Sequence, residues 1–285
     1  MQPITPITPL LSQLDQRFGE RLLRLGQGQQ AVREAGSGDA IVLLHGIGSG
    51  AASWLQVALG LSERARVIAW DAPGYGQSTP LPMAAPDACA YAGRLLQTLD
   101  ALAIERCVLV GHSLGALTAA AFAQAHPHRV SRLVLLSPAR GYGAKPEQGQ
   151  AVRSKRLHSL AQMGIAQMAR ERSGHLLSAS ASSQALAWVQ WNMARLLPHG
   201  YRQAIELLCG DDLLRHAPQA VPCEVHCGSA DAITRPDDCQ ALAAALGAPF
   251  KLIPGAGHAC AIEQPDTVTG LLARALDASE TGSVL

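Results

Sequence analysis

Buried strands alternate with helices along most of this chain, and this alternation limits the possible folds more than any other feature. Continuous apolar runs at residues 40–46, 66–71, 107–113 and 132–138 are typical of strands that are buried on both faces. Helical stretches separate these runs. Since consecutive parallel strands need crossover helices, the pattern predicts an α/β fold with a mostly parallel sheet flanked by helices.

The alternation stops at Arg140 and resumes near residue 216. Between them the sequence offers only amphipathic helical pieces such as residues 184–197, which indicates a helical cap inserted after the sixth strand. The start of the chain is rich in proline and threonine, which predicts a loose arm. The expected organisation is an N-terminal arm (1–20), a first core part (21–139), the cap (140–215) and a second core part (216–285).

Composition excludes several classes of protein. The chain has 285 residues, 48% of them hydrophobic and 16% charged, so it can bury a sizeable core. With 23 basic and 22 acidic residues it carries no overall field for nucleic acid. No apolar run reaches the ~18–20 residues that cross a bilayer. The N-terminus lacks the basic and apolar regions of a signal peptide, so we expect a cytoplasmic protein with no membrane partner.

The seven cysteines agree with a reducing compartment, because a secreted disulfide framework is usually short, dense and even in number. Cys223 and Cys227 flank His226 and invite a metal interpretation. However, these residues lie in an expected strand, where alternate side chains face opposite ways, and a second ligand pair is missing. We therefore expect buried apolar thiols and no metal site.

A candidate nucleophile lies in Gly111-His112-Ser113-Leu114-Gly115, which matches G-x-S-x-G. The motif follows a buried strand directly and precedes a helix, as the nucleophile turn of a hydrolase requires. The serine of such a turn is lifted above the sheet on a strained backbone, and the helix N-terminus adds partial positive charge. The alternative is a serine that only caps a helix. Ser113 is the expected nucleophile.

A serine hydroxyl needs a base, and that base needs a carboxylate that orients it. Both groups are expected past the carboxyl ends of late strands. His258 follows such a strand on a glycine-flanked loop, and Asp231 closes the strand before it. His45 ends an earlier strand and is expected to organise a loop. Other carboxylates are weaker candidates. Asp71 lies before a structural turn, and Asp237 and Asp238 begin a helix. Asp211 and Asp212 lie where the chain returns from the cap to the core.

Two backbone N–H groups should stabilise the negative charge that develops on the substrate carbonyl. Leu114 directly follows the nucleophile and supplies the first. The glycine-rich segment His45–Gly50 supplies the second, most plausibly at Ile47. This segment matches neither phosphate-loop pattern, G-x-x-x-x-G-K-[ST] or G-x-G-x-x-G, so it is not expected to bind a nucleotide.

The segments HGIGSG, DAPGYGQS, GHSLGA, GSADAITRP and GAGH, in this order, resemble the α/β-hydrolase superfamily over about residues 22–139 and 216–276. Among its members the chain is most similar to single-cap hydrolases related to 3-oxoadipate enol-lactonases, carboxylesterases and meta-cleavage-product hydrolases. The resemblance implies an eight-stranded sheet, a triad of Ser113, His258 and Asp231, an oxyanion hole at Ile47 and Leu114, and no cofactor. Ser113 excludes relatives with an aspartate nucleophile.

The cap is expected to set specificity. It carries ten basic and five acidic side chains, whereas the rest of the chain is net acidic. Either a cap arginine meets an anionic group of the substrate or these charges solvate the outer helix faces. Trp188, Trp191 and Met193 are candidates for the substrate pocket. The two tryptophans share a helix face, and packing of the cap on the core is the alternative role.

These observations favour a cofactor-independent serine hydrolase that cleaves carboxylic esters or lactones of small-molecule size through an acyl-enzyme. Hydrolysis of carbon–carbon bonds in ring-fission products remains open. A perhydrolase that uses acetate and peroxide is a further alternative. A ligand-binding module with a vestigial triad is the remaining one, and it would show a single slow turnover with stable retention of its ligand. The sequence leaves the oligomeric state and the natural substrate undetermined.

Overall fold

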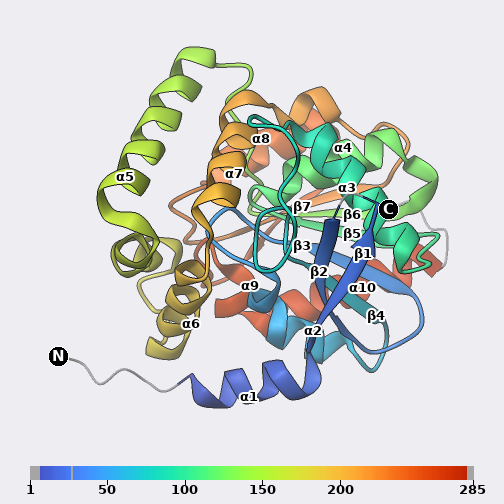
Figure 1. Cartoon of the computed structure of the whole chain (residues 1–285). Helices are drawn as coiled ribbons and strands as arrows, with labels where there is room; N and C mark the ends of the chain where they lie inside the picture. The colour runs from blue at the N-terminus through green and yellow to red at the C-terminus, as the bar shows by residue number, and fades with distance from the viewer. Residues whose placement is uncertain (1–6, 27, 281–285) are drawn as a thin grey trace.

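A computed structural model describes residues 7–26 and 28–280 and contains one eight-stranded sheet (Figure 1). The strands lie in the order β1-β2-β4-β3-β5-β6-β7-β8. The pairs β1–β2 and β2–β4 are antiparallel, and all later pairs are parallel. The predicted mostly parallel α/β sheet with flanking helices is confirmed.

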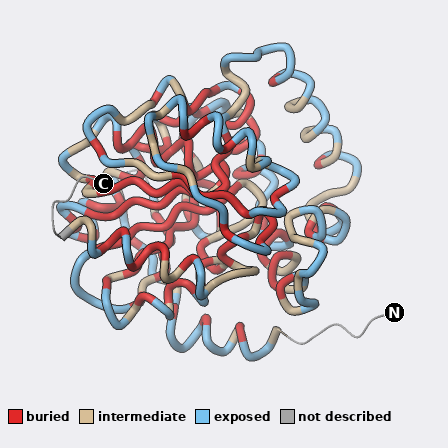
Figure 2. The backbone as a smooth tube through the Cα atoms, turned by 180° about the vertical axis from the view of Figure 1, so that it is seen from behind, coloured by how far each residue is buried: buried red, intermediate tan, exposed pale blue. Residues whose placement is uncertain are grey.

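The strands are short, and the central ones are buried on both faces. Their bounds are β1 Glu20–Leu25, β2 Gly28–Ala35, β3 Ala40–Leu44, β4 Arg66–Trp70, β5 Cys107–His112, β6 Val130–Leu136, β7 Cys223–Gly228 and β8 Phe250–Ile253. Every residue of β3 is buried, as are the first five residues of β5. This burial explains why these strands read as continuous apolar runs, and Figure 2 shows it as a band through the molecule.

Helices cover both faces of the sheet. One face packs against α3 (Ala88–Ala101), α4 (Gly115–Ala125) and α8 (Pro236–Leu246). The other packs against α2 (Leu55–Leu61) and α10 (Pro265–Glu280). The short α9 (Cys260–Glu263) lies beside α10. Two apolar layers therefore hold the sheet rigid and fix the loops at the carboxyl ends of its strands.

The cap is helical and follows β6, as predicted. It consists of α5 (Pro146–Arg172), α6 (Ser183–Ala194) and α7 (Pro198–Gly210), with α5 and α7 in contact (Figure 1). Inside α5, Gly164 has φ 65° and ψ 175°, so the helix is kinked at a residue that tolerates this conformation. The kink divides α5 into two helical segments.

The prediction of a loose N-terminal arm is wrong for the part that the structure describes. Residues Thr8–Arg17 form helix α1, which packs against α2 (Figure 1). Leu10, Leu14 and Phe18 recur every four residues and are buried in the core. Proline in the first turn does not oppose this helix, because the first N–H groups have no intrahelical acceptor. Residues 1–6 lie outside the described part.

The backbones of the cap and the core are in direct contact at two glycines, Gly74 and Gly200. Gly74, with φ 82°, lies in the turn after β4, and Gly200 lies in the first turn of α7. A Cβ atom on Gly200 would lie 2.0 Å from the Gly74 carbonyl oxygen, and one on Gly74 would lie 2.6 Å from the Gly200 Cα. Neither position admits a side chain, so this contact fixes the start of α7 against the core.

Candidate active site

Ser113 occupies a strained turn between β5 and α4. Its φ is 51°, a left-handed value that is unfavourable for a non-glycine residue. Its backbone N–H donates to the Leu136 carbonyl at 3.0 Å. The flanking glycines are required for space, because a Cβ on Gly111 would lie 2.7 Å from the Ala116 Cα and one on Gly115 would lie 2.6 Å from the Leu44 carbonyl oxygen. The local geometry is that of a nucleophile turn.

Asp231 and His258 lie together past the ends of β7 and β8. The His258 Nδ1–H donates to Asp231 Oδ2 at 2.9 Å, and both side chains are almost fully buried. The same carboxylate accepts the backbone N–H groups of Ile233 and Thr234 at 2.8 and 3.0 Å through Oδ1. The Thr234 hydroxyl lies 2.9 Å from Asp231 Oδ2. Asp231 is therefore held in one orientation behind the imidazole.

The surroundings of Asp231 keep it ionised. Burial alone would raise its pKa, but the hydrogen bond and charge of His258 and the N–H of Ile233 lower the pKa to about 2. A fixed carboxylate at Nδ1 sets the imidazole tautomer and leaves Nε2 free to accept a proton.

His112 packs beside this pair. Its Nε2–H donates to the His258 backbone carbonyl at 2.8 Å, and the two imidazole centroids are 4.9 Å apart. Burial and the neighbouring His258 lower the pKa of His112 to about 3, so the ring is neutral. Nothing in the sequence pattern marked His112 as a contact of the candidate base.

The two candidate oxyanion donors are free to bind an incoming oxygen. Within residues 7–26 and 28–280, the N–H groups of Ile47 and Leu114 have no protein acceptor. A Cβ on Gly46 would lie 3.0 Å from the Ser113 Cβ, so the loop before Ile47 lies directly against the serine. Unpaired N–H groups beside a nucleophile are the arrangement that stabilises a developing oxyanion.

Three buried side chains outside the predicted triad hold this loop. The Tyr75 hydroxyl donates to the Ile47 carbonyl at 2.9 Å. Asp71 Oδ1 accepts the Ala51 N–H at 2.8 Å. His45 donates from Nδ1 to the Gly46 carbonyl and accepts the Ala72 N–H at Nε2, at 2.8 and 3.0 Å. The predicted loop-organising role of His45 is confirmed.

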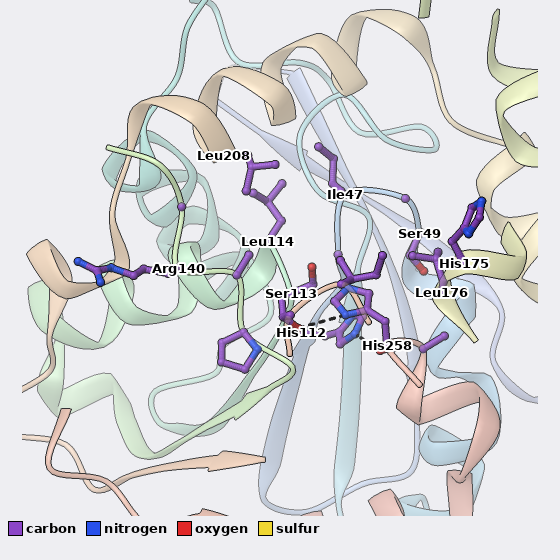
Figure 3. A pocket seen from close by; sticks show the side chains of 18 of the residues that line it. Ile47, Ser49, His112, Ser113, Leu114, Arg140, His175, Leu176, Leu208 and His258 are labelled. Atoms are coloured by element: carbon purple, nitrogen blue, oxygen red, sulfur yellow. Dashed lines mark hydrogen bonds between the residues drawn. The ribbon is translucent and has the colours of Figure 1, made fainter. Parts of the chain in front are cut away.

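A cavity of about 620 Å³ opens over Ser113 and His258 (Figure 3). Ile47, Leu114 and Met193 also line it, so five of the eight candidate residues face one space. Asp231 lies behind His258 and does not line it. In Figure 3, Arg140 and His175 lie toward opposite ends of this cavity.

The expectation that Trp188 and Trp191 line the cavity is wrong. Their rings stack on each other with centroids 4.7 Å apart and 3° between planes, as their helical spacing predicts. Trp188 is buried in the layer that covers the α2 and α10 face of the sheet, and Arg195 lies over the Trp191 ring at 4.6 Å. Their role is packing of α6. Met193, on the same helix, approaches the glycine-rich loop His45–Gly50, since a Cβ on Gly48 would lie 3.1 Å from its methyl carbon.

The described residues contain no group of three or more His, Cys, Asp or Glu side chains arranged to hold a metal ion. The same part of the chain has no helix that is both long and apolar enough to cross a membrane. The seven cysteines, all within this part, are free thiols.

A strained serine, an aspartate–histidine pair and two free N–H groups at the carboxyl ends of parallel strands are the features of an α/β hydrolase. Comparison with known families agrees. The family model described as "alpha/beta hydrolase fold" matches residues 39–265, and the chain belongs to this family.

The curated relatives that carry a named activity are hydrolases. The chain is 37% identical over 115 residues to a 2-hydroxy-6-oxo-6-phenylhexa-2,4-dienoate hydrolase of Comamonas testosteroni, covering 39% of this chain and 40% of that protein. The matches to curated relatives span 38–49% of their lengths.

Solved structures match over nearly the whole fold. A thermophilic esterase from Thermogutta terrifontis superposes with a TM-score of 0.81 at 25% identity, covering 91% of this chain and 98% of that one. The enol-lactonase from Burkholderia xenovorans LB400 superposes with a TM-score of 0.80 at 26% identity, covering 90% and 100%.

Proposed function

We propose that this protein is a cofactor-independent serine hydrolase that cleaves carboxylic esters or lactones through an acyl-enzyme. The observation that carries the proposal is the Asp231–His258 hydrogen bond of 2.9 Å beside a cavity that the strained Ser113 also lines. An esterase and an enol-lactonase among the structural neighbours support the same reaction class.

In the proposed reaction, Ser113 Oγ attacks the substrate carbonyl carbon while His258 Nε2 takes the hydroxyl proton. The N–H groups of Ile47 and Leu114 bind the oxygen that becomes negative. The carbon–oxygen bond to the leaving group then breaks, and His258 returns the proton to that group. Water repeats the sequence on the acyl-enzyme and releases the acid. Asp231 keeps Nδ1 protonated throughout.

The test is hydrolysis of p-nitrophenyl esters with acyl chains of two to twelve carbons by the wild type and by Ser113→Ala. We expect turnover by the wild type and a loss of at least ~10³-fold in the variant. Equal activity of both proteins would show that Ser113 is not the nucleophile. Single slow turnover with a retained ligand would instead favour a binding module.

A second candidate is hydrolysis of a carbon–carbon bond in ring-fission products. It is favoured by the 37% identity to the Comamonas testosteroni hydrolase. The discriminating measurement is the absorbance of 2-hydroxy-6-oxo-6-phenylhexa-2,4-dienoate on mixing with the protein. Loss of its colour with multiple turnovers, combined with inactivity toward simple esters, would select this candidate.

We also propose that the protein acts in the cytoplasm on a small-molecule substrate. Free thiols at all seven cysteines support a reducing compartment. Titration of the purified protein with a thiol reagent under denaturing conditions should find seven reactive groups without prior reduction.

A further inference from the structure

The cavity over Ser113 is rich in positive charge. Arg140, Lys145, Arg156 and Arg172 line it, whereas Asp238 is the single acidic lining residue in the part of the chain that the structure describes. The whole chain, by contrast, is close to neutral, with a net charge of +1. An excess of cations around a recessed site favours anionic ligands.

Two arginines near this cavity have a carboxylate partner inside the protein, whereas Arg156 and Arg172 have none among the residues that the structure describes. Arg140 makes a two-point contact with Asp212, with nitrogen–oxygen distances of 3.2 and 3.1 Å. Arg153 on α5 makes a similar contact with Glu206 on α7 and does not line the cavity. These charges are already compensated by the fold.

Arg156 differs from Arg153, which lies one helical turn earlier. Its Nη1 donates to the Tyr201 hydroxyl at 3.1 Å, and this is a neutral partner. Tyr201 is only 2% exposed and lines the same cavity. A guanidinium group has five N–H donors. The remaining donors of Arg156 have no carboxylate acceptor within residues 7–26 and 28–280.

Arg156 and Ser113 line the same cavity of about 620 Å³. A substrate bound at Ser113 can therefore extend toward Arg156 without leaving the cavity.

We propose that Arg156 and Tyr201 form a carboxylate-binding subsite, so that the preferred substrates are esters or lactones with a second, ionised carboxyl group. This inference rests on the proposed ester hydrolysis. Arg156 supplies two parallel N–H donors to the carboxylate, and the Tyr201 hydroxyl donates its own proton while it accepts from Arg156. A charge-assisted contact of this kind discriminates by roughly 10- to 100-fold.

The test compares two substrates with the same six-carbon diacid chain, mono-p-nitrophenyl adipate and its methyl ester, in which the distal carboxyl group is masked. Release of p-nitrophenol is followed for the wild type, Arg156→Gln, Arg172→Gln and the control Arg153→Gln. We expect the wild type to prefer the acid in kcat/KM by at least ~10-fold. Arg156→Gln should abolish this preference, and Arg153→Gln should retain it.

The proposal is overturned if the wild type shows no preference for the acid, if Arg156→Gln keeps the full preference, or if Arg172→Gln alone removes it. Circular dichroism melting of each variant identifies misfolding. If Arg156→Gln misfolds, Arg156→Lys takes its place. The lysine keeps the charge but loses the two-point geometry, so it should reduce the preference for the acid to an intermediate value.

If the wild type hydrolyses neither ester, the proposed function fails, and the subsite is tested separately by calorimetric titration with adipate. Binding by the wild type and Arg153→Gln, with at least ~10-fold weaker binding by Arg156→Gln, would support the subsite. Equal binding by all three proteins would overturn it.

Discussion

The His112 Nε2–H donates a hydrogen bond of 2.8 Å to the backbone carbonyl of His258, so the residue before the candidate nucleophile holds the loop of the candidate base. This contact joins positions 146 residues apart in the chain. Since His112 is neutral, it acts as a fixed donor and not as a second base. Its proposed role is to position His258.

His112→Ala should lower kcat by about 10-fold, because the His258 carbonyl loses its donor and the imidazole can shift away from Ser113. KM should change by less than ~2-fold, since the lost hydrogen bond acts on His258 and not on the substrate. Steady-state kinetics on a p-nitrophenyl ester measure both constants. The exposed His128→Ala is the control, and a His112→Ala enzyme with unchanged kcat would refute the positioning role.

Asp231→Asn should lower kcat by about 10³- to 10⁴-fold at neutral pH, since an amide no longer fixes the tautomer or stabilises the imidazolium. The control is Asp237→Asn, an exposed carboxylate in the first turn of α8. A decrease of less than tenfold in Asp231→Asn would mean that another carboxylate serves His258.

Tyr75→Phe should lower kcat by roughly 5- to 10-fold with a small effect on KM, because the Ile47 peptide is no longer held for the oxyanion. Tyr91→Phe is a matched control. The Tyr91 hydroxyl is buried and has no hydrogen-bond partner among the described residues, so its removal should leave kcat unchanged and raise the melting temperature slightly. Equal losses of kcat in both variants would contradict this assignment.

Acid should destabilise the protein partly through Asp211. Burial would raise its pKa, but hydrogen bonds from His216, Ala88 and Asp212 lower the pKa to about 2. An aspartate in the unfolded chain titrates near ~3.9, so the folded state favours the carboxylate. Its contribution, about 2 kcal/mol, is complete above pH ~4 and is lost as the pH falls toward 2.

Urea unfolding of the wild type and Asp211→Asn between pH 2 and 7 measures this contribution. The difference in unfolding free energy should be largest at pH 7 and should shrink below pH ~4. Asp277→Asn, on an exposed side chain, is the control. A difference between the wild type and Asp211→Asn that does not depend on pH would show that Asp211 acts by packing alone.

Local sequence patterns were sufficient to predict the strand–helix alternation, the helical insertion and the positions of Ser113, Asp231 and His258. Strands buried on both faces must be apolar throughout, and the loops after them are marked by glycine. The roles of these three residues in catalysis remain predictions for the experiments above.

Contacts between distant segments could not be predicted in the same way. The spacing of Trp188 and Trp191 correctly predicts that they share a helix face. Whether that face contacts the cavity or the core depends on how α6 packs, which the spacing does not determine. Tyr75 reaches Ile47 across 28 residues, and Arg156 reaches Tyr201 across 45. The segment of helix α1 carries two opposing signals, because its proline and threonine indicate a loose arm whereas the spacing of Leu10 and Leu14 indicates a helix.

The backbone contact between Gly74 and Gly200 restricts how this scaffold can be re-engineered. Any library that randomises or transplants the cap helices must keep glycine at both positions, because even a methyl group would push α7 off the core. Arg156 lies on α5 and reaches α7 through its hydrogen bond to Tyr201, so its identity can be varied without changing either glycine. New specificities are therefore best sought by redesigning α5 and leaving the start of α7 untouched.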